Sequence, residues 1–374
     1  MGLSFKEKYY LMHKDRKVVL FDFGGNVKIL NKKFLPYGLY IEEKNDVETC
    51  TNNSLNITNW LARRVITIDR KYSKEIYNFL NIAQNSDDRT KAEFSISYHS
   101  LSLTDVYWVK GIDEKISFNK INLYDNSLSN AFVDVFLRGK GLTIDRKGLD
   151  SKDISTSGQC PKAWVREKNK KLVLYKDGNV NEVKNEVLAS KIISCFKVNA
   201  VQYRLDTYEK KLVSKCDIIT SKEYSLLNAF DLKIYCMNHD IDFYAYILKL
   251  DKYNYYMMNI IDYLIGNNDR HPNNWGVLID NRTNKILRLY SLMDFNKSFK
   301  NYNNLRGGKC LTTKESMSQM EAAVEAVDAI DIKLMKNIFK EYFINNDTKR
   351  IMFFKRLNKL KSSIEVIGRI KGAR

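Results

Sequence analysis

The sequence predicts an α+β protein with two lobes, a small β-rich lobe followed by a larger helical lobe. Between residues 161 and 219 the chain reads as several short strands around a single helix. From residue 224 to the C-terminus, most segments show the apolar spacing that is typical of helices. A stretch rich in Gly, Ser, Asp and Lys at residues 139–160 separates these lobes from an N-terminal block. We therefore place the domains at 1–145, 146–223 and 224–374.

The N-terminal block, residues 1–145, is predicted to be a mixed α/β subdomain. Three β-prone runs, RKVVLFDF, VKIL and LPYGLYIEE, occur between residues 16 and 43. The spacing of Ile57, Trp60 and Leu61 predicts a helix over residues 56–83, and SISYHSLSLTDVYWVKG predicts an extended segment over 95–111. No motif in the block indicates a role, so docking of a partner or a substrate stays open.

The second block, residues 146–223, is predicted to be the small β-rich lobe. The runs KAWVRE and KKLVLYKDG predict a hairpin that begins after Pro161. A helix is expected from about residue 181 to 196, followed by strands near 198–206 and 211–219.

Composition indicates a globular protein, because 44% of the residues are hydrophobic and 12% are aromatic. The formal net charge of +18 is compatible with nucleic acid, but the basic residues are spread along the chain, so this partner is not favoured. The six cysteines show no metal-ligand spacing, and the N-terminus lacks an apolar signal segment. No apolar run reaches the roughly 20 residues of a membrane span. We expect a cytoplasmic protein with no membrane partner.

The stretch IGNNDRHPNNWGVL, Ile265–Leu278, follows a segment with the pattern of a buried helix. Apolar residues at 257, 260, 261, 264 and 265 form one stripe of that helix, and Gly266 is a typical helix end. The polar loop 267–274 is therefore expected to leave a rigid element, which suits reactive side chains.

After this loop, WGVLID and KILRLY predict a hairpin over residues 275–290 with its turn near Arg282. Folding back at that turn brings Asn274 close to Asp294, and Asp269 lies in the same loop as Asn274. An amide and a carboxylate oxygen suit Mg²⁺, and a second aspartate can accept a proton from a hydroxyl. The order D-x-x-x-x-N, hairpin, D-F is the order of protein-kinase catalytic residues.

Further parts of a phosphotransfer site are expected upstream. Lys176 ends the strand KKLVLYK, and Glu186 lies in the next helix at a spacing that suits a charge partner. The same roles could fall to other residues: Lys170, Lys171 or Lys184 for the lysine, and Glu182 for the glutamate. Contact of Arg270 or His271 with phosphate also stays open.

With these parts in order, residues 150–300 resemble the HipA-like serine/threonine kinases, the toxin-type branch of the kinase-like fold. In that family a loop S-x-x-G-x-Q-x-K covers the nucleotide. The corresponding stretch here is STSGQCPK, in which the glutamine has moved by one place. The second metal motif reads Asp-Phe-Asn, and two asparagines precede Asp269. The nucleotide-binding residues that the resemblance implies in this loop are Ser155, Ser157, Gly158, Gln159 and Lys162.

The resemblance implies ATP and Mg²⁺ as cofactors. It makes Asp269 the catalytic base and Asn274 and Asp294 the Mg²⁺ ligands. It also makes Lys176 the phosphate-binding lysine, with Glu186 orienting it. The stretch CDIIT, with Asp217 and Ile219, falls where a hinge strand meets adenine, and Ser155 or Ser157 is the expected autophosphorylation site.

The function expected from this resemblance is transfer of the ATP γ-phosphate to a protein hydroxyl, with an antitoxin-like protein as a further partner. Two other functions stay open. One is a catalytically weak module that binds a nucleotide or nucleic acid. The other is a phosphotransferase that acts on a small molecule.

Overall fold

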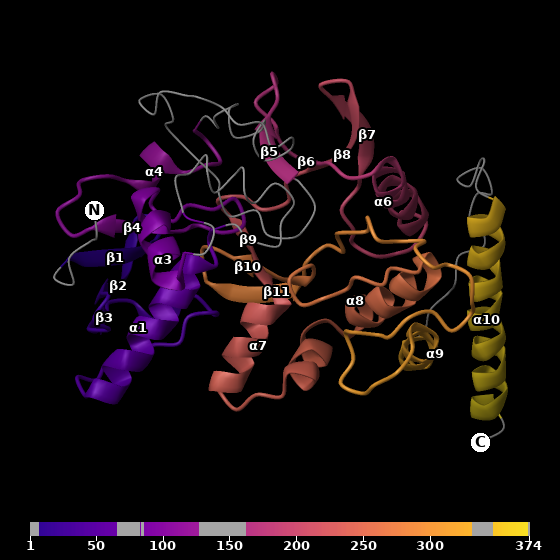
Figure 1. Cartoon of the computed structure of the whole chain (residues 1–374). Helices are drawn as coiled ribbons and strands as arrows, with labels where there is room; N and C mark the ends of the chain where they lie inside the picture. The colour runs from indigo at the N-terminus through magenta and orange to yellow at the C-terminus, as the bar shows by residue number, and fades with distance from the viewer. Residues whose placement is uncertain (1–6, 66–82, 84–85, 127–161, 331–346, 373–374) are drawn as a thin grey trace. The chain divides into compact units, whose positions relative to one another are not determined.

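The computed structural model describes residues 7–65, 83, 86–126, 162–330 and 347–372 (Figure 1). The chain forms two compact units. The predicted boundary near residue 145 lies outside the described residues, as do Ser155, Ser157, Gly158 and Gln159 of the predicted nucleotide loop. The first unit comprises Met1–Asp177, Asp217–Asp240 and Leu278–Ile286, and the second comprises Gly178–Cys216, Ile241–Val277 and Leu287–Arg374.

In the first unit, four antiparallel strands form a sheet in the order β3-β2-β1-β4. Leu11 of β1 lies opposite Val19 on one side and Val109 on the other, so apolar residues meet across the sheet. The third β-prone run, residues 35–43, is not a strand, because Pro36 and Gly38 interrupt it. The strands are β1 (Lys8–His13), β2 (Arg16–Asp22), β3 (Val27–Ile29) and β4 (Tyr107–Gly111), with the 3-10 helix η1 (Lys32–Phe34).

The helices of the N-terminal block begin at aspartate caps. Helix α1 (Val47–Ala62) starts earlier than predicted, because the Asp46 side chain accepts a hydrogen bond from Thr49 N. Helix α3 (Asp88–Ser97) starts in the same way at Asp87. The extended segment predicted over 95–111 is therefore wrong at its beginning and correct only at β4. A short helix, α4 (Phe118–Ile121), follows.

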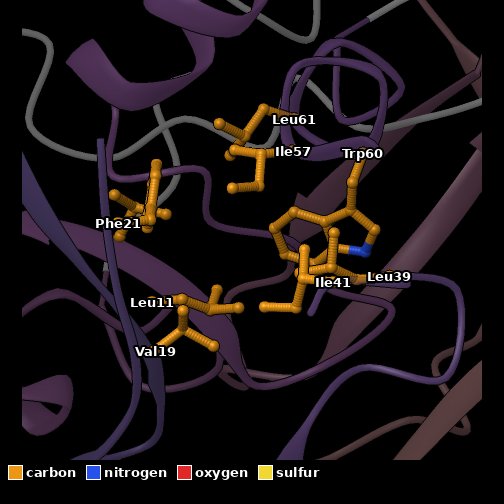
Figure 2. A pocket seen from close by; sticks show the side chains of 9 residues that line it. Leu11, Val19, Phe21, Leu39, Ile41, Ile57, Trp60 and Leu61 are labelled. Carbon is orange, nitrogen blue, oxygen red and sulfur yellow. The ribbon is translucent and has the colours of Figure 1, made fainter. Parts of the chain in front are cut away.

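The core of the N-terminal block lies between this sheet and helix α1 (Figure 2). It contains one cavity of about 10 Å³, which has room for no more than a single water molecule. The lining is apolar and aromatic, so the cavity is a gap in packing and not a ligand site. Its lining residues are Leu11, Val19, Phe21, Leu39, Ile41, Ile57, Trp60, Leu61 and Val109.

His13 is enclosed at the end of β1, with 0% of its surface exposed. Its ring lies 4.7 Å from the ring of Phe34 and 5.0 Å from that of Tyr107. Neither ring nitrogen has a hydrogen-bond partner in the described part of the chain. Burial, and then the charges of Arg16 and Lys14, lower the pKa of His13 from 6.5 to about 4.

We expect acid to destabilise the protein through His13. Between pH 6.5 and about 4, the unfolded chain binds a proton at this histidine that the folded chain does not. The free energy of unfolding therefore decreases as the pH is lowered through this range. Below this pH range the decrease in the free energy of unfolding reaches its full value of about 3 kcal/mol. Urea unfolding at about pH 7 and about pH 5 should show a smaller loss for His13→Phe than for the parent. Equal losses would contradict the assignment, and His239→Gln, at an exposed histidine, is the control.

The hairpin that was predicted after Pro161 is present in the first unit. Strands β5 (Lys162–Arg166) and β6 (Leu172–Lys176) are antiparallel, and Lys162 lies opposite Lys176. Leu172 packs in a second apolar cluster with Met12, Leu103, Trp108 and Phe118. The hairpin therefore shares a core with the N-terminal block.

A strand that the sequence analysis missed, β9 (Tyr224–Asn228), precedes α7 (Ala229–Asn238). Five residues are too short for helical and extended patterns to be told apart. The predicted hairpin over 275–290 is confirmed as β10 (Gly276–Asp280) and β11 (Lys285–Leu289), and the sheet has the order β11-β10-β9.

The second unit is mainly helical. One helix and the antiparallel pair of β7 and β8 precede the long α8. The order of these elements was predicted correctly, but several of their boundaries differ from the prediction. None of the helices in the described ranges has the length and apolarity that a membrane crossing requires. The elements are α6 (Val180–Ile193), β7 (Arg204–Tyr208), β8 (Lys211–Asp217), α8 (Phe243–Ile265), α9 (Gln319–Ala329) and α10 (Asp347–Gly372).

Candidate active site

The loop that carries Asp269 leaves a rigid helix, as predicted. The predicted apolar stripe of α8 is fully buried, and Gly266 ends the helix in the left-handed conformation, with φ of 62°. A Cβ at this position would lie 2.5 Å from Tyr302 Cδ2, so glycine is required by conformation and by space. Helix α8 has a kink at Asp251. The Asp251 carboxylate stabilises it by accepting hydrogen bonds from Asn254 N in the same helix and from Leu289 N in β11. The second bond ties β11 to α8.

Arg270 holds the loop from behind. Its guanidinium donates to both carboxylate oxygens of Asp262, at 2.8 and 3.0 Å. It also donates to the carbonyl oxygens of Asn274, at 2.9 Å, and Met293, at 2.6 Å. Burial opposes the charge of Arg270, but the nearby Asp262 carboxylate raises its pKa. Arg270 is therefore a buried clamp between the two ends of the hairpin, and the sequence-based option of a phosphate contact is not supported.

Asn274 is 2% exposed and has one unused hydrogen-bonding atom. Its side-chain amide donates to the Asp269 carbonyl, which fixes the orientation of the amide group. The remaining atom, Oδ1, is buried and has no hydrogen-bond partner among the described residues. Leaving a buried acceptor unsatisfied costs about 1–3 kcal/mol, so we expect a further ligand for this oxygen. An amide oxygen in this state suits a hard cation.

Asp269 is half-buried in the same loop. Burial raises the pKa of its carboxyl group above the usual 3.8; the charge of His271 opposes this shift, and the Asp294 carboxylate adds to it. Its backbone is fixed by Asn267 Oδ1, which accepts from Asp269 N at 3.4 Å. His271 hydrogen-bonds within the loop, where its Nδ1 lies 3.3 Å from Asn273 N.

Asp294 has a left-handed backbone, with φ of 63°, which is uncommon for a residue other than glycine. Such strain is kept only where the surroundings impose it, and it is found often at functional sites. Asp294 N donates to the Tyr203 hydroxyl at 3.3 Å, and Phe295 N donates to Glu186 Oε1 at 3.4 Å. Helix α6 therefore helps to set the conformation of the Asp-Phe-Asn segment.

The structure also bears on the residues that competed for the upstream roles. Lys176 and Glu186 are both buried, which is rare for charged side chains. Of the alternatives, Lys171 is exposed and forms an ion pair with Asp217 at 2.8 Å. Glu182 caps α6 and pairs with Lys297 at 2.5 Å. Burial thus favours the predicted pair, whose roles stay predictions.

The remaining predicted nucleotide residues are only partly described. Lys162 faces Lys176 across the β5–β6 hairpin. Asp217 pairs with Lys171 as stated above, and Ile219 is half-buried just beyond β8. Contact of either residue with adenine stays a prediction.

Three supporting residues were missed from sequence: Asp262, Arg270 in its clamp role, and Gln319. The Gln319 side chain donates to the Asn267 carbonyl at 2.7 Å, so the first residue of α9 supports the loop. The capping box that begins α9, with Ser318 and Glu321, could have located this helix end from sequence. The hydrogen bond itself could not be inferred, because it joins segments far apart in the chain.

Asn274 and Asp294 fit Mg²⁺ better than a transition metal. The described ranges contain no group of three or more His, Cys, Asp and Glu side chains that could hold a metal. Mg²⁺ usually takes only one or two carboxylates and completes its shell with water and phosphate oxygens.

The arrangement of the elements has the kinase-like fold, and similarity to one solved structure agrees. The fold matches HipA from a Shewanella oneidensis MR-1 toxin–antitoxin structure that also contains HipB and operator DNA, with a TM-score of 0.53 and 9% identity over 96% of this chain and 91% of that chain. The Helicobacter pylori proinflammatory kinase CtkA aligns with a TM-score of 0.43 and 15% identity, over 56% of this chain and 95% of that one. No protein-family model and no curated protein sequence matches the chain. The HipA similarity confirms the predicted fold class, a two-lobed kinase-like α+β fold of the HipA type.

Proposed function

We propose that the chain is an ATP-dependent serine/threonine protein kinase of the HipA-like type. The observation that carries this proposal is the buried Asn274 Oδ1, an acceptor with no donor in the described part of the chain. It lies in the loop of Asp269, and Arg270 connects the Asn274 carbonyl to the carbonyl that precedes Asp294. An amide oxygen and two carboxylates with separate tasks are the set that phosphoryl transfer requires.

In this proposal Asn274 Oδ1 and the Asp294 carboxylate hold Mg²⁺. When bound, the ion neutralises charge on the ATP phosphates and on the group in transfer. Lys162 and Lys176, which face each other across their hairpin, add positive charge for the phosphates. Glu186 orients Lys176 and also fixes Phe295 N, next to the metal-binding aspartate.

Asp269 accepts the proton in the transfer step. The oxygen of the acceptor hydroxyl forms a bond to the γ-phosphorus, and the bond from that phosphorus to the β–γ bridging oxygen breaks, which releases ADP. The hydroxyl proton moves to the Asp269 carboxylate. The raised pKa of Asp269, caused first by burial, makes it a better proton acceptor than an exposed aspartate.

Control of the kinase and its partners belong to the same proposal. Ser155 or Ser157 is the autophosphorylated residue, by resemblance of the loop STSGQCPK to the HipA-like loop. An antitoxin-like protein is the proposed partner. It is supported by the similarity in fold to a HipA that was solved with HipB and operator DNA.

The test is mass spectrometry of the chain after incubation with ATP and Mg²⁺. We expect a mass gain of one phosphoryl group that maps to Ser155 or Ser157, together with release of ADP; EDTA should prevent both. A chain that forms no phosphoprotein, neither itself nor an added protein acceptor, would contradict the proposal. Salt-sensitive oligonucleotide binding without ADP release would instead favour the binding-module alternative.

A further inference from the structure

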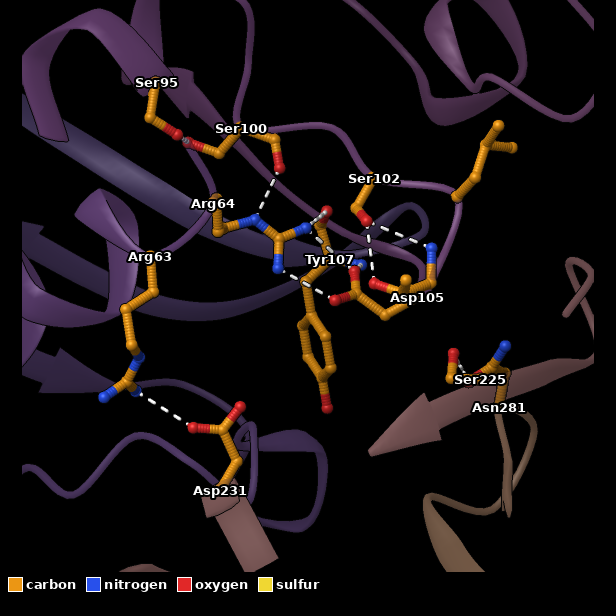
Figure 3. Close-up of polar contacts among 12 residues, drawn as sticks. Arg63, Arg64, Ser95, Ser100, Ser102, Asp105, Tyr107, Ser225, Asp231 and Asn281 are labelled. Carbon is orange, nitrogen blue, oxygen red and sulfur yellow. Dashed lines mark hydrogen bonds and ion pairs between the residues drawn. The ribbon is translucent and has the colours of Figure 1, made fainter. Parts of the chain in front are cut away.

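The turn of the β10–β11 hairpin is buried, which is unusual for a hairpin turn. Asn281 is 1% exposed and Asn284 is 5% exposed, whereas between them Thr283 is half-buried and Arg282 is exposed. Asn281 Oδ1 accepts a hydrogen bond from Ser225 Oγ at 2.7 Å (Figure 3). The Asn281 side-chain amide donates to the carbonyl of Lys222 at 3.2 Å. One end of the turn is thus fixed to the segment around β9.

Asn284, at the other end of the turn, is held by the N-terminal block. Its side-chain amide donates to the carbonyls of Lys33, at 2.9 Å, and Leu35, at 3.2 Å. The Tyr37 hydroxyl donates to the Asn284 carbonyl at 2.8 Å. The Tyr107 hydroxyl lies 3.2 Å from Asn284 Oδ1, to which it donates. Both polar groups of this side chain are therefore used, and we call Lys33, Leu35, Tyr37 and Tyr107 the turn socket.

The turn socket is itself rigidly built. Arg64 donates to both carboxylate oxygens of Asp105, at 2.8 and 2.9 Å, and to the carbonyl of Tyr107 (Figure 3). Asp105 Oδ1 also accepts from Tyr107 N at 2.9 Å. A bidentate arginine–carboxylate pair with little exposure fixes geometry well. The tyrosine that contacts Asn284 is therefore held at its backbone on both sides.

The same hairpin carries the proposed metal ligands at its open end. Asn274 precedes β10, Asp294 follows β11, and Asn284 lies midway between them in the sequence. The open end is closed by a hydrogen bond from Tyr290 N to the Gly276 carbonyl at 2.9 Å. Residues Leu278–Ile286 belong to the compact unit of the N-terminal block, so this block holds the hairpin by its turn.

We propose that the N-terminal block positions the metal ligands by gripping the hairpin turn, with Asn284 as the positioning residue. This inference rests on the proposed kinase function. A paired strand transmits displacement along its length, so a turn that slips in its socket shifts the residues that follow the strands. Residues that orient metal ligands from outside the ligand shell typically affect metal affinity by about 10–100-fold.

The experiment compares variants of the turn and its socket in the full chain. Asn284→Gly removes the side-chain contacts and tolerates the left-handed backbone of this position, where φ is 56°. Tyr107→Phe removes only the hydroxyl, and it keeps the test decisive if the glycine variant folds poorly. Arg282→Ala changes the exposed position of the same turn and is the matched control.

Two quantities are measured well below the melting temperature of each variant. The first is the dissociation constant of Mn²⁺ in the presence of ATP, measured by electron paramagnetic resonance. The second is the Mg²⁺ concentration that gives half-maximal phosphoryl transfer. We expect both to rise about tenfold in Asn284→Gly, to rise less in Tyr107→Phe, and to stay unchanged in Arg282→Ala.

The outcomes separate this inference from the function on which it rests. If the parent transfers phosphate and Asn284→Gly and Tyr107→Phe match it in both measurements, the positioning role is wrong and the kinase function stands. If the variants only melt at a lower temperature, the contacts serve stability alone and the positioning role is again wrong. A parent chain that neither binds Mn²⁺ nor transfers phosphate overturns the kinase function and this inference with it.

Discussion

Asp269→Asn is expected to reduce phosphoryl transfer by roughly 10²–10⁴-fold. Asparagine has the shape of aspartate but cannot accept the hydroxyl proton at neutral pH. The chain should fold as well as the parent or slightly better. Burial raises the pKa of Asp269, which means that the folded state disfavours its charge, and the variant removes that charge. Loss of activity without loss of stability is the signature of a catalytic residue.

The measurement is transfer of ³²P from ATP, with thermal melting of each variant recorded beside it. Asn273→Ala is the matched control, because Asn273 is an exposed residue of the same loop, next to Asn274. It should keep the activity of the parent. Transfer by Asp269→Asn at the parental rate would show that this carboxylate is not the proton acceptor.

The sequence was sufficient for the parts of the site that depend on local pattern. The buried stripe of α8, the stop at Gly266 and the hairpin after Asn274 each follow from spacing or turn chemistry within a few residues. Together they predicted that the segment of Asp294 returns toward that of Asn274. The structure agrees, because Arg270 donates to the carbonyls of Asn274 and Met293 at once.

What sequence reasoning missed depends on long-range contacts or short segments. Strand β9 is too short for its period to be recognised, and the aspartate caps of α1 and α3 were overlooked although they are visible in the sequence. The contacts of Asn284 with the N-terminal block join residues far apart in the chain, and no local pattern encodes them. In sequence, a buried asparagine at a turn cannot be distinguished from the exposed asparagines that are common in turns.

Arg270→Met is expected to cause the largest loss of stability of any change proposed for this protein, at about 3–5 kcal/mol. The substitution leaves the Asp262 carboxylate buried without its cation and removes the donor from the carbonyls of Asn274 and Met293. Exposed ion pairs contribute far less, typically about 0.2–1 kcal/mol. Arg350→Met is therefore the matched control, because Arg350 pairs with Asp347 at 2.7 Å on the surface of α10.

Unfolding in urea, followed by circular dichroism, measures both variants and the double variant Arg270→Met with Asp262→Leu. Removing the stranded carboxylate should restore at least about 1 kcal/mol relative to Arg270→Met alone, because the cost of an unpaired buried charge disappears. The carbonyls of Asn274 and Met293 stay without their donor in the double variant, so phosphoryl transfer should not recover with stability. Recovery of both together would mean that Arg270 acts only by balancing the charge of Asp262 and not by joining the two ends of the hairpin. If Arg270→Met lowers the free energy of unfolding by as little as Arg350→Met does, Arg270 does not act as a clamp.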